Sequence, residues 1–301
     1  NRPFLRQARI RRLEDIESFD PYEPLSLDGL DTYQLRAEFL SRGALPDVML
    51  KTRMPAGLLA QPYADWMGDQ LEALRARVEF WAAQWQKKQP DPITRHDLSI
   101  ARFKLSVCVP ESLAVPVWLR CSPARVQGKH LLRGWLEYLA WQALCPANGM
   151  DRCMVIVGHS DTIQYGPVSP AQARDWLADW LQLWQQMAVQ PVVLPAELLA
   201  QNLKKLKKQA AAGPYSAQPL LDSWLGRGYR GNDQTPAHQD EGCSLHPDWQ
   251  LILRGQDAAA ALDAAVRAHV PRLYVPILDH HQILQEKNQG QKKDPAGDHA
   301  P

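Results

Sequence analysis

His159, Ser160 and Asp161 stand side by side and are the three residue types of a hydrolase triad. A nucleophile elbow needs a glycine two residues after the serine, and that place is taken by Thr162. Adjacent residues on a strand also point to opposite faces of a sheet, so these three side chains cannot form a hydrogen-bonded relay. We therefore predict that residues 158–161 form a turn between two strands.

Gly128, Lys129 and His130 resemble the end of a phosphate-binding P-loop. Such a loop needs an earlier glycine, where this chain has Pro123, and a serine or threonine after the lysine, where it has His130. Neither the cradle of backbone N–H groups nor the hydroxyl ligand for Mg²⁺ can form. Lys129 is interpreted as a solvated residue at the start of a helix.

Metal ligands are sparse. His238, Cys243 and His246 lie in one irregular stretch, but they supply a single Cys-x-x-His pair and one separate histidine. A structural zinc site normally pairs two close ligand couples. The paired histidines His280 and His281 are interpreted as the end of a helix. We therefore expect no metal site.

Two groups of side chains could contact other molecules. Four lysines lie close together at Lys204, Lys205, Lys207 and Lys208, where they could bind phosphates or form a solvated helix face. Three tryptophans with a spacing of four residues could stack on bases, fill a core or form a subunit interface; these are Trp176, Trp180 and Trp184. The sequence leaves these alternatives open, and we treat the lysines as DNA-contact candidates and the tryptophans as partner-interface candidates.

The composition indicates a globular protein rather than one that coats nucleic acid. A hydrophobic content of 45% with 11 Trp suffices for a core, and a net charge of +1 excludes a general basic excess. The five cysteines are odd in number and irregularly spaced, which predicts reduced thiols in a cytoplasmic protein. We expect no signal peptide and no membrane span, and the missing initial methionine suggests a fragment of something longer.

Periodicity and turn residues predict an N-terminal helical segment over residues 1–92, a mixed core over 93–285 and a disordered tail over 286–301. The first expected helix is capped by Asp28 or Asp31 and runs to about Ser41. The other expected helices cover residues 64–88, 128–144, 170–189, 196–212 and 258–285, the last kinked or split by two prolines. The expected strands cover residues 98–109 and 115–121, which form a hairpin, and residues 154–158 and 161–165. The arrangement is α/β, a small mixed sheet flanked by helices. Residues 213–242 are expected to be the least ordered internal stretch.

Several segments resemble the C-terminal domain of RecC, the gamma subunit of exodeoxyribonuclease V. The two strongest cover residues 23–36 and 127–139. Weaker ones follow in the family's order at residues 187–195, 246–254 and 273–278. The resemblance therefore runs from Asn1 to about Gln282, without residues 213–242 and the tail.

This resemblance implies a degenerate PD-(D/E)xK nuclease-like fold within a DNA-repair helicase–nuclease. The implied partners are RecB-like and RecD-like subunits, duplex DNA and single-stranded DNA, and no membrane. ATP and Mg²⁺ would belong to the partner subunits, so this domain is expected to need no cofactor. Its implied role is to scaffold the motor and nuclease subunits, to help split the duplex and to guide single strands.

The implied nuclease chemistry needs an aspartate on one strand and Asp/Glu-x-Lys on the next, so that carboxylates hold Mg²⁺ while the lysine assists the attacking water. No lysine of this chain has Asp or Glu two residues before it. Residues 117–121 are Val-Trp-Leu-Arg-Cys where an acidic strand is expected. We therefore expect no catalytic residues and no enzymatic activity for this domain by itself.

Three hypotheses follow. The first is a non-catalytic subunit domain, in which a hairpin between Cys108 and Trp118 is a candidate strand-separating wedge and Trp118 stacks on a base; the alternative is that this segment belongs to the buried sheet. The second is an active nuclease with a migrated site, which would require Asp97, Glu111, Glu137 and Asp161 to converge. The third is a protein-interaction module without DNA contact.

Overall fold

A mixed four-stranded sheet lies at the centre of the fold. The computed structural model describes residues 29–42, 60–87, 91–146, 151–211, 213–225 and 243–285. The sheet has the order β3-β4-β5-β6, with β3 Val117–Cys121, β4 Cys153–Val157, β5 Thr162–Tyr165 and β6 His281–Leu284. β3 and β4 are parallel and the other pairs are antiparallel. Parallel neighbours need a crossover connection, which α5 (Lys129–Leu144) supplies.

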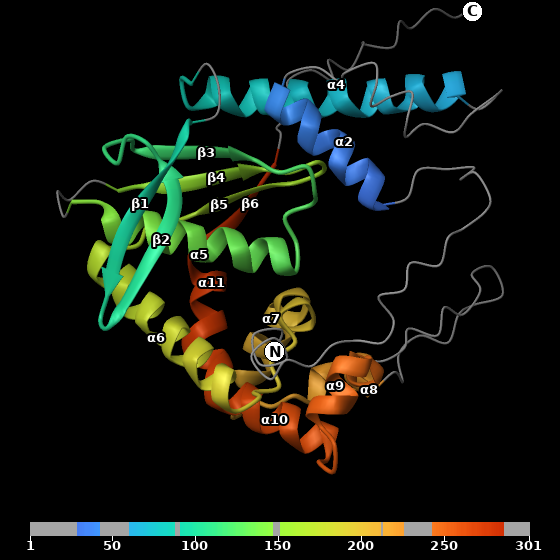
Figure 1. Ribbon diagram of the computed structural model, residues 1–301, viewed down its shortest axis with the longest axis vertical. Coiled ribbons are helices and arrows are strands. Elements are labelled where there is room, and N and C mark those ends of the chain that lie inside the picture. Colours follow the sequence, from blue (N-terminus) through green and yellow to red (C-terminus); the bar gives the residue numbers. More distant parts are fainter. Residues whose placement is uncertain are drawn as a thin grey trace, which may run out of the picture.

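Helices cover both faces of this sheet (Figure 1). On one face Trp118, Ile156 and Tyr165 belong to the large core that also contains α5. On the other face Val155 and its neighbours pack against α4 (Ala60–Gln84) through Trp81 and Ala82. Because both faces are covered, β3 and β4 are apolar almost throughout rather than alternating with polar residues.

The predicted N-terminal helical segment thus contributes to the same layered unit as the sheet. α2 (Gly29–Arg42) packs on α4 through Leu35, Phe39, Met67 and Leu71, and α4 in turn covers the sheet. The predicted boundary at residue 92 falls in the connection between α4 and β1. The predicted tail, residues 286–301, lies outside the described residues. None of the helices in the described ranges is long and apolar enough to cross a membrane.

The predicted hairpin is wrong in its location. The two strands that pair are β1 (Ile93–Ile100) and β2 (Phe103–Pro110), and β3 instead joins the central sheet. The turn falls at Ala101 and Arg102, inside the segment that was expected to be one strand. Ala101 has a φ of 48°, a conformation that alanine rarely adopts. The turn contains no glycine, asparagine or proline, so its residue types did not predict it.

The tip of this hairpin lies on α6 (Pro170–Val189) rather than projecting from the molecule. Arg102 donates to the side-chain oxygen of Gln185, and Arg174 Nη1 donates to the carbonyl of Ser99 at 3.1 Å. Leu98, Ile100 and Val109 bury one face of the hairpin in the main core. No hairpin therefore spans Cys108 to Trp118, which corrects the wedge hypothesis.

The predicted helix starts and ends are confirmed for α5 and α6. Ser169 caps α6 through a reciprocal capping box with Gln172, and Pro170 stands at the first helical position. The following helix, α7, covers Ala196–Ala210.

The C-terminal part contains short helices and ends in a strand. Its elements are η2 Gln218–Leu220, α8 Leu221–Leu225, η3 Cys243–Leu245, α9 Pro247–Ile252, α10 Ala258–His269, the π-helical η4 Val270–Tyr274 and α11 Val275–Asp279. The prediction of a helix to residue 285 is wrong after Asp279, because His281–Leu284 pairs with β5 as β6. This pairing supplies hydrogen-bond partners to the free edge of β5. The local spacing of apolar residues does not show that this edge needs a partner.

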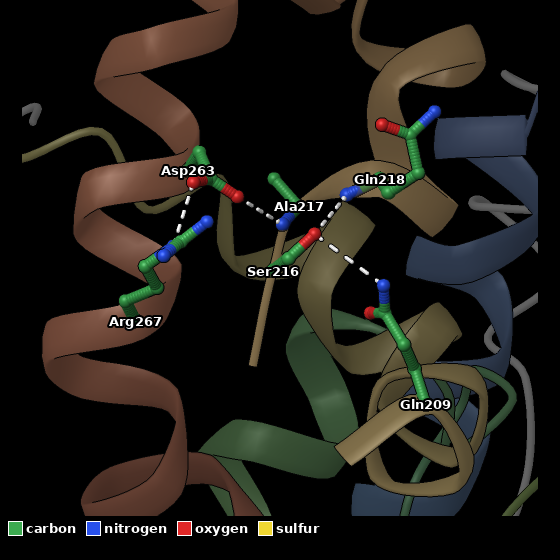
Figure 2. A network of polar contacts seen from close by, with 6 residues as sticks. All are labelled: Gln209, Ser216, Ala217, Gln218, Asp263 and Arg267. Carbon is green, nitrogen blue, oxygen red and sulfur yellow. Dashed lines mark hydrogen bonds and ion pairs between the residues drawn. The ribbon is translucent and has the colours of Figure 1, made fainter. Parts of the chain in front are cut away.

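A polar network fastens the connection after α7 to α10 (Figure 2). Asp263 accepts from the backbone N–H of Ala217 and from Nε of Arg267, both at 2.7 Å. Ser216 Oγ accepts from the backbone N–H of Gln218 at 3.1 Å and from Nε2 of Gln209 at 3.4 Å. Two of these bonds satisfy the backbone donors of Ala217 and Gln218, where the chain leaves one helix for the next.

Replacing Gly134 by alanine tests how closely α5 lies on the sheet. The new methyl carbon would lie 2.6 Å from Cδ1 of Ile156 and 3.0 Å from the hydroxyl of Tyr165. Overpacking costs about 1–3 kcal/mol and the better helix propensity of alanine returns up to about 1 kcal/mol. We expect Gly134→Ala to lower the free energy of unfolding in urea by about 1–2 kcal/mol.

Gly68→Ala in α4 is the matched control, because nothing lies within 4 Å of its new methyl carbon. We expect that variant to raise the free energy of unfolding by about 0.5–1 kcal/mol. Equal stability of the two variants would show that α5 does not depend on this close approach.

Candidate interaction surfaces

The central sheet lacks the residue types of a nuclease site. None of its four strands carries an aspartate, a glutamate or a lysine. Within the described ranges, no group of three or more His, Cys, Asp or Glu side chains could hold a metal ion. A carboxylate on these buried strands would also lose its hydration, which is costly unless it is paired.

The four carboxylates of the migrated-site hypothesis are not brought together. Asp97 is exposed on β1, and Glu111 is exposed just after β2. Glu137 on α5 forms ion pairs with Arg120 and with Arg133, the latter at 2.9 Å between Nε and Oε1.

The fourth carboxylate, Asp161, has a structural role. Its Oδ1 accepts from the backbone N–H of Val126 at 2.9 Å, and its carbonyl accepts from the N–H of Gly158 at 2.7 Å. These bonds close the turn between β4 and β5. The prediction that residues 158–161 form a turn between two strands is thereby confirmed.

Trp118 lies in the core. Its side chain is only 1% exposed, and its ring packs edge-on against Trp141 on α5, with centroids 5.8 Å apart and an interplanar angle of 69°. Burial leaves no ring face for a base in this fold, so the structure agrees with the alternative that this segment belongs to the buried sheet.

The three tryptophans of α6 have different surroundings. Trp176 packs against Trp135 at 5.6 Å between ring centroids and against His280 at 5.3 Å. Trp180 packs edge-on against Tyr274 at 5.1 Å. Trp184 is 53% exposed. Trp176 and Trp180 are therefore partly buried against the core, and Trp184 lies at the surface.

An apolar groove of about 540 Å³ lies where β2, α5 and α6 meet. It is lined by Leu105, Val107, Cys108 and Val109 of β2, by Lys129, Leu132, Arg133, Leu136, Glu137 and Ala140 of α5, and by Leu177, Trp180, Leu181 and Trp184 of α6. The charged members all belong to α5. We call this surface the apolar groove.

A second surface carries the predicted lysines on α7. Lys204, Lys205, Lys207 and Lys208 are all exposed, and Lys207 forms an ion pair with Asp279. Three of them line a hollow of about 500 Å³ whose other members, on α11 and β6, are Leu278, His281, Gln282 and Ile283. We call this surface the lysine face.

The charge of the lysine face comes from the lysines alone at neutral pH. Burial lowers the pKa of His281, and the nearby Lys204 lowers it further, against a hydrogen bond with the carbonyl of Ile277 that raises it. Since this pKa lies below the ordinary histidine value, the ring is neutral at pH 7.

The sequence indicated the tryptophans of the apolar groove but not the groove itself. The stripe on α6 is Leu177, Trp180, Leu181 and Trp184, with the i, i+3, i+4, i+7 spacing of one helix face. That spacing was visible. The wall of the groove that β2 forms could not be predicted, because the residues of β2 were expected to pair in a different hairpin.

The fold and these surfaces define an α/β domain with two candidate interaction surfaces and, in its described part, no assembled metal centre. The sequence profile of the RecC C-terminal domain matches residues 2–207, about two thirds of the chain. The chain belongs to this family, and RecC is a subunit of exodeoxyribonuclease V, the RecBCD complex. A comparison with curated proteins found no match. The match ends at Lys207, so the resemblances at residues 246–254 and 273–278 stay predictions.

The cysteines allow the apolar groove to be probed chemically. Cys108 is exposed on its rim. Burial raises the pKa of Cys121 to about 12 and that of Cys145 and Cys153 to about 11. Only thiolates react with maleimides. At pH 7 we expect Cys108 to be labelled at least tenfold faster than these three, as measured by peptide mass spectrometry. Unfolding in urea should make the labelling rates of all four cysteines equal. Fast labelling of Cys121 in the folded protein would contradict this assignment of burial.

Proposed function

We propose that the chain is a non-catalytic domain of the RecC subunit of a DNA double-strand-break repair helicase–nuclease. In this role it scaffolds the motor and nuclease subunits in the cytoplasm and helps to split duplex DNA and guide single strands. Its partners are RecB-like and RecD-like subunits, which bring ATP and Mg²⁺. Membership of the RecC C-terminal domain family is the observation that carries the proposal.

Two structural observations support it. The strands that would hold a nuclease site are apolar and buried on both faces, which fits a domain without its own reaction. The apolar groove and the lysine face suit one protein partner and one anionic partner. We assign the strand-guiding contacts to Lys204, Lys205, Lys207 and Lys208. We assign the partner contacts to Trp180 and Trp184, since both line the apolar groove and Trp176 does not.

Association with the partner subunits tests the scaffold role. We expect the purified chain to copurify with RecB-like and RecD-like subunits at both 0.1 M and 1 M salt, because apolar contacts are not screened whereas exposed charges are. Size-exclusion chromatography of the mixture measures this. Failure to associate at both salt concentrations would remove the scaffold role.

DNA binding by the isolated chain is expected to be weak and strongly dependent on salt. Each phosphate contact contributes about 0.9 to the slope of log affinity against log salt on duplex DNA and about 0.7 on single strands. We expect Lys208→Glu to lower the magnitude of this slope on duplex DNA by about 0.9, the contribution of one phosphate contact, as measured by fluorescence anisotropy. Lys104→Glu on β2 makes the same change of charge away from the lysine face and is the control. Equal effects of the two substitutions would show that only net charge matters.

The chain by itself is expected not to cut DNA. Incubation of linear duplex and single-stranded DNA with Mg²⁺ or Mn²⁺ should leave both intact on a denaturing gel. The reason is that the carboxylates available for Mg²⁺ do not converge on one site in the described structure. Metal-dependent cleavage that Asp97→Asn or Asp161→Asn abolishes would establish the migrated-site nuclease instead.

A further inference from the structure

We propose that the apolar groove binds an amphipathic helix from a partner subunit, about three turns long, that carries an acidic residue at the end facing Lys129 and Arg133. This inference rests on the proposed function and goes further by assigning the surface, the secondary structure and the charge of the bound segment. It draws on the shape of the groove, on its lining and on its charges.

The shape of the groove fits a helix. The lining residues of α5 run from Lys129 to Ala140 at the spacing of one helix face, and a helix rises about 1.5 Å per residue, so this wall is about 16 Å long. The stripe from Leu177 to Trp184 on α6 forms the second wall. Two helices with such stripes accept the i, i+3, i+4, i+7 side chains of a third helix, as helix-in-groove recognition does.

The lining favours a polypeptide over a small molecule. Sites for small molecules combine apolar walls with a few polar groups that fix the orientation of the ligand. Here the walls contributed by β2 and α6 are apolar along the groove, apart from the thiol of Cys108 and the indole N–H groups of Trp180 and Trp184. An extended apolar surface beside the half-exposed Trp184 is the composition of a protein interface core, in which tryptophan is enriched.

The charges of the groove are unequal. Glu137 is already engaged by Arg120 and Arg133, so its charge is compensated within the chain. Lys129 is exposed at the start of α5, where the helix dipole adds positive charge. The side chain of Glu197 lies against Gly128 and offsets part of this charge. The excess is positive, and a carboxylate on the bound helix would complement it.

Protection of Cys108 tests where the partner binds. The chain is labelled with a maleimide alone and in complex with the RecB-like and RecD-like subunits, and the rates are read by peptide mass spectrometry. We expect labelling of Cys108 to slow at least tenfold in the complex. Cys243, which lies on η3 outside the groove, is the internal control and should keep its rate.

Two substitutions on α6 test the energetic role of the groove. Trp184→Glu should weaken the complex at least tenfold, because it places a charge in an apolar interface. Val189→Glu introduces the same charge at an 80% exposed position of the same helix, outside the groove, and should change affinity less than twofold. Circular dichroism establishes that both variants fold, and Trp184→Phe should restore most of the affinity.

The charge of the bound helix has its own test. Lys129→Glu should weaken the complex severalfold at 0.1 M salt and much less at 1 M salt, since screening removes the interaction. Arg254→Glu, which makes the same change of charge at an exposed position outside both surfaces, should have no such effect. Equal effects of the two substitutions would remove the acidic residue from the proposal.

The remaining outcomes are distinct. A stable complex in which Cys108 is labelled at its free rate overturns this inference and leaves the scaffold role standing. Protection of Cys108 that depends on the concentration of the chain alone, with a dimer by light scattering, overturns it in favour of a second copy. Absence of any complex overturns both the inference and the scaffold role.

Discussion

The close packing of α5 on the central sheet is the contact on which the rest of the structure depends. Gly134 lets the helix backbone approach Ile156, and the hydroxyl of Tyr165 donates to the carbonyl of Leu131 at 2.8 Å. Trp135, one residue further, extends this contact to Trp176 on α6. The position of α6 therefore follows from that of α5, and the apolar groove between them exists because these two helices are held at a fixed spacing.

The same packing explains why the strands of this sheet carry no acidic side chain. A nuclease centre needs carboxylates that reach both water and the metal ion. Here α4 closes one face through Trp81 and α5 closes the other, so the strands bury apolar side chains in both directions. An ionised carboxylate placed at Val155 or Trp118 would be desolvated without a partner, at a cost of several kcal/mol. The buried positions of these strands are therefore unsuited to an unpaired metal-binding carboxylate.

The parts of the fold that could be predicted are those with a local cause. The capping box at Ser169, the crossover helix α5 and the turn before Asp161 each have a signature within a few residues. The turn at Ala101 has none, because alanine there adopts a left-handed conformation imposed by the pairing of β1 with β2. β6 was not predicted, because residues 281–284 form a strand only by pairing with the free edge of β5, more than a hundred residues earlier in the chain. The apolar groove could not be predicted from the sequence for the same reason, since its walls come from segments that are distant in the chain.

The apolar groove and the lysine face would bind their partners through different interactions, apolar burial and charge, and they lie on different elements. They can therefore be occupied at the same time. The groove is formed by β2, α5 and α6, the lysine face by α7, α11 and β6, and no residue belongs to both. Salt screens the charge of the exposed lysines beyond a Debye length of about 8 Å under physiological conditions but leaves apolar burial in place. A partner subunit held through the groove would therefore stay bound while nucleic acid exchanges at the lysine face. That division of labour is what a scaffold in a moving DNA machine requires, because the permanent contact has to be insensitive to the charge that passes beside it.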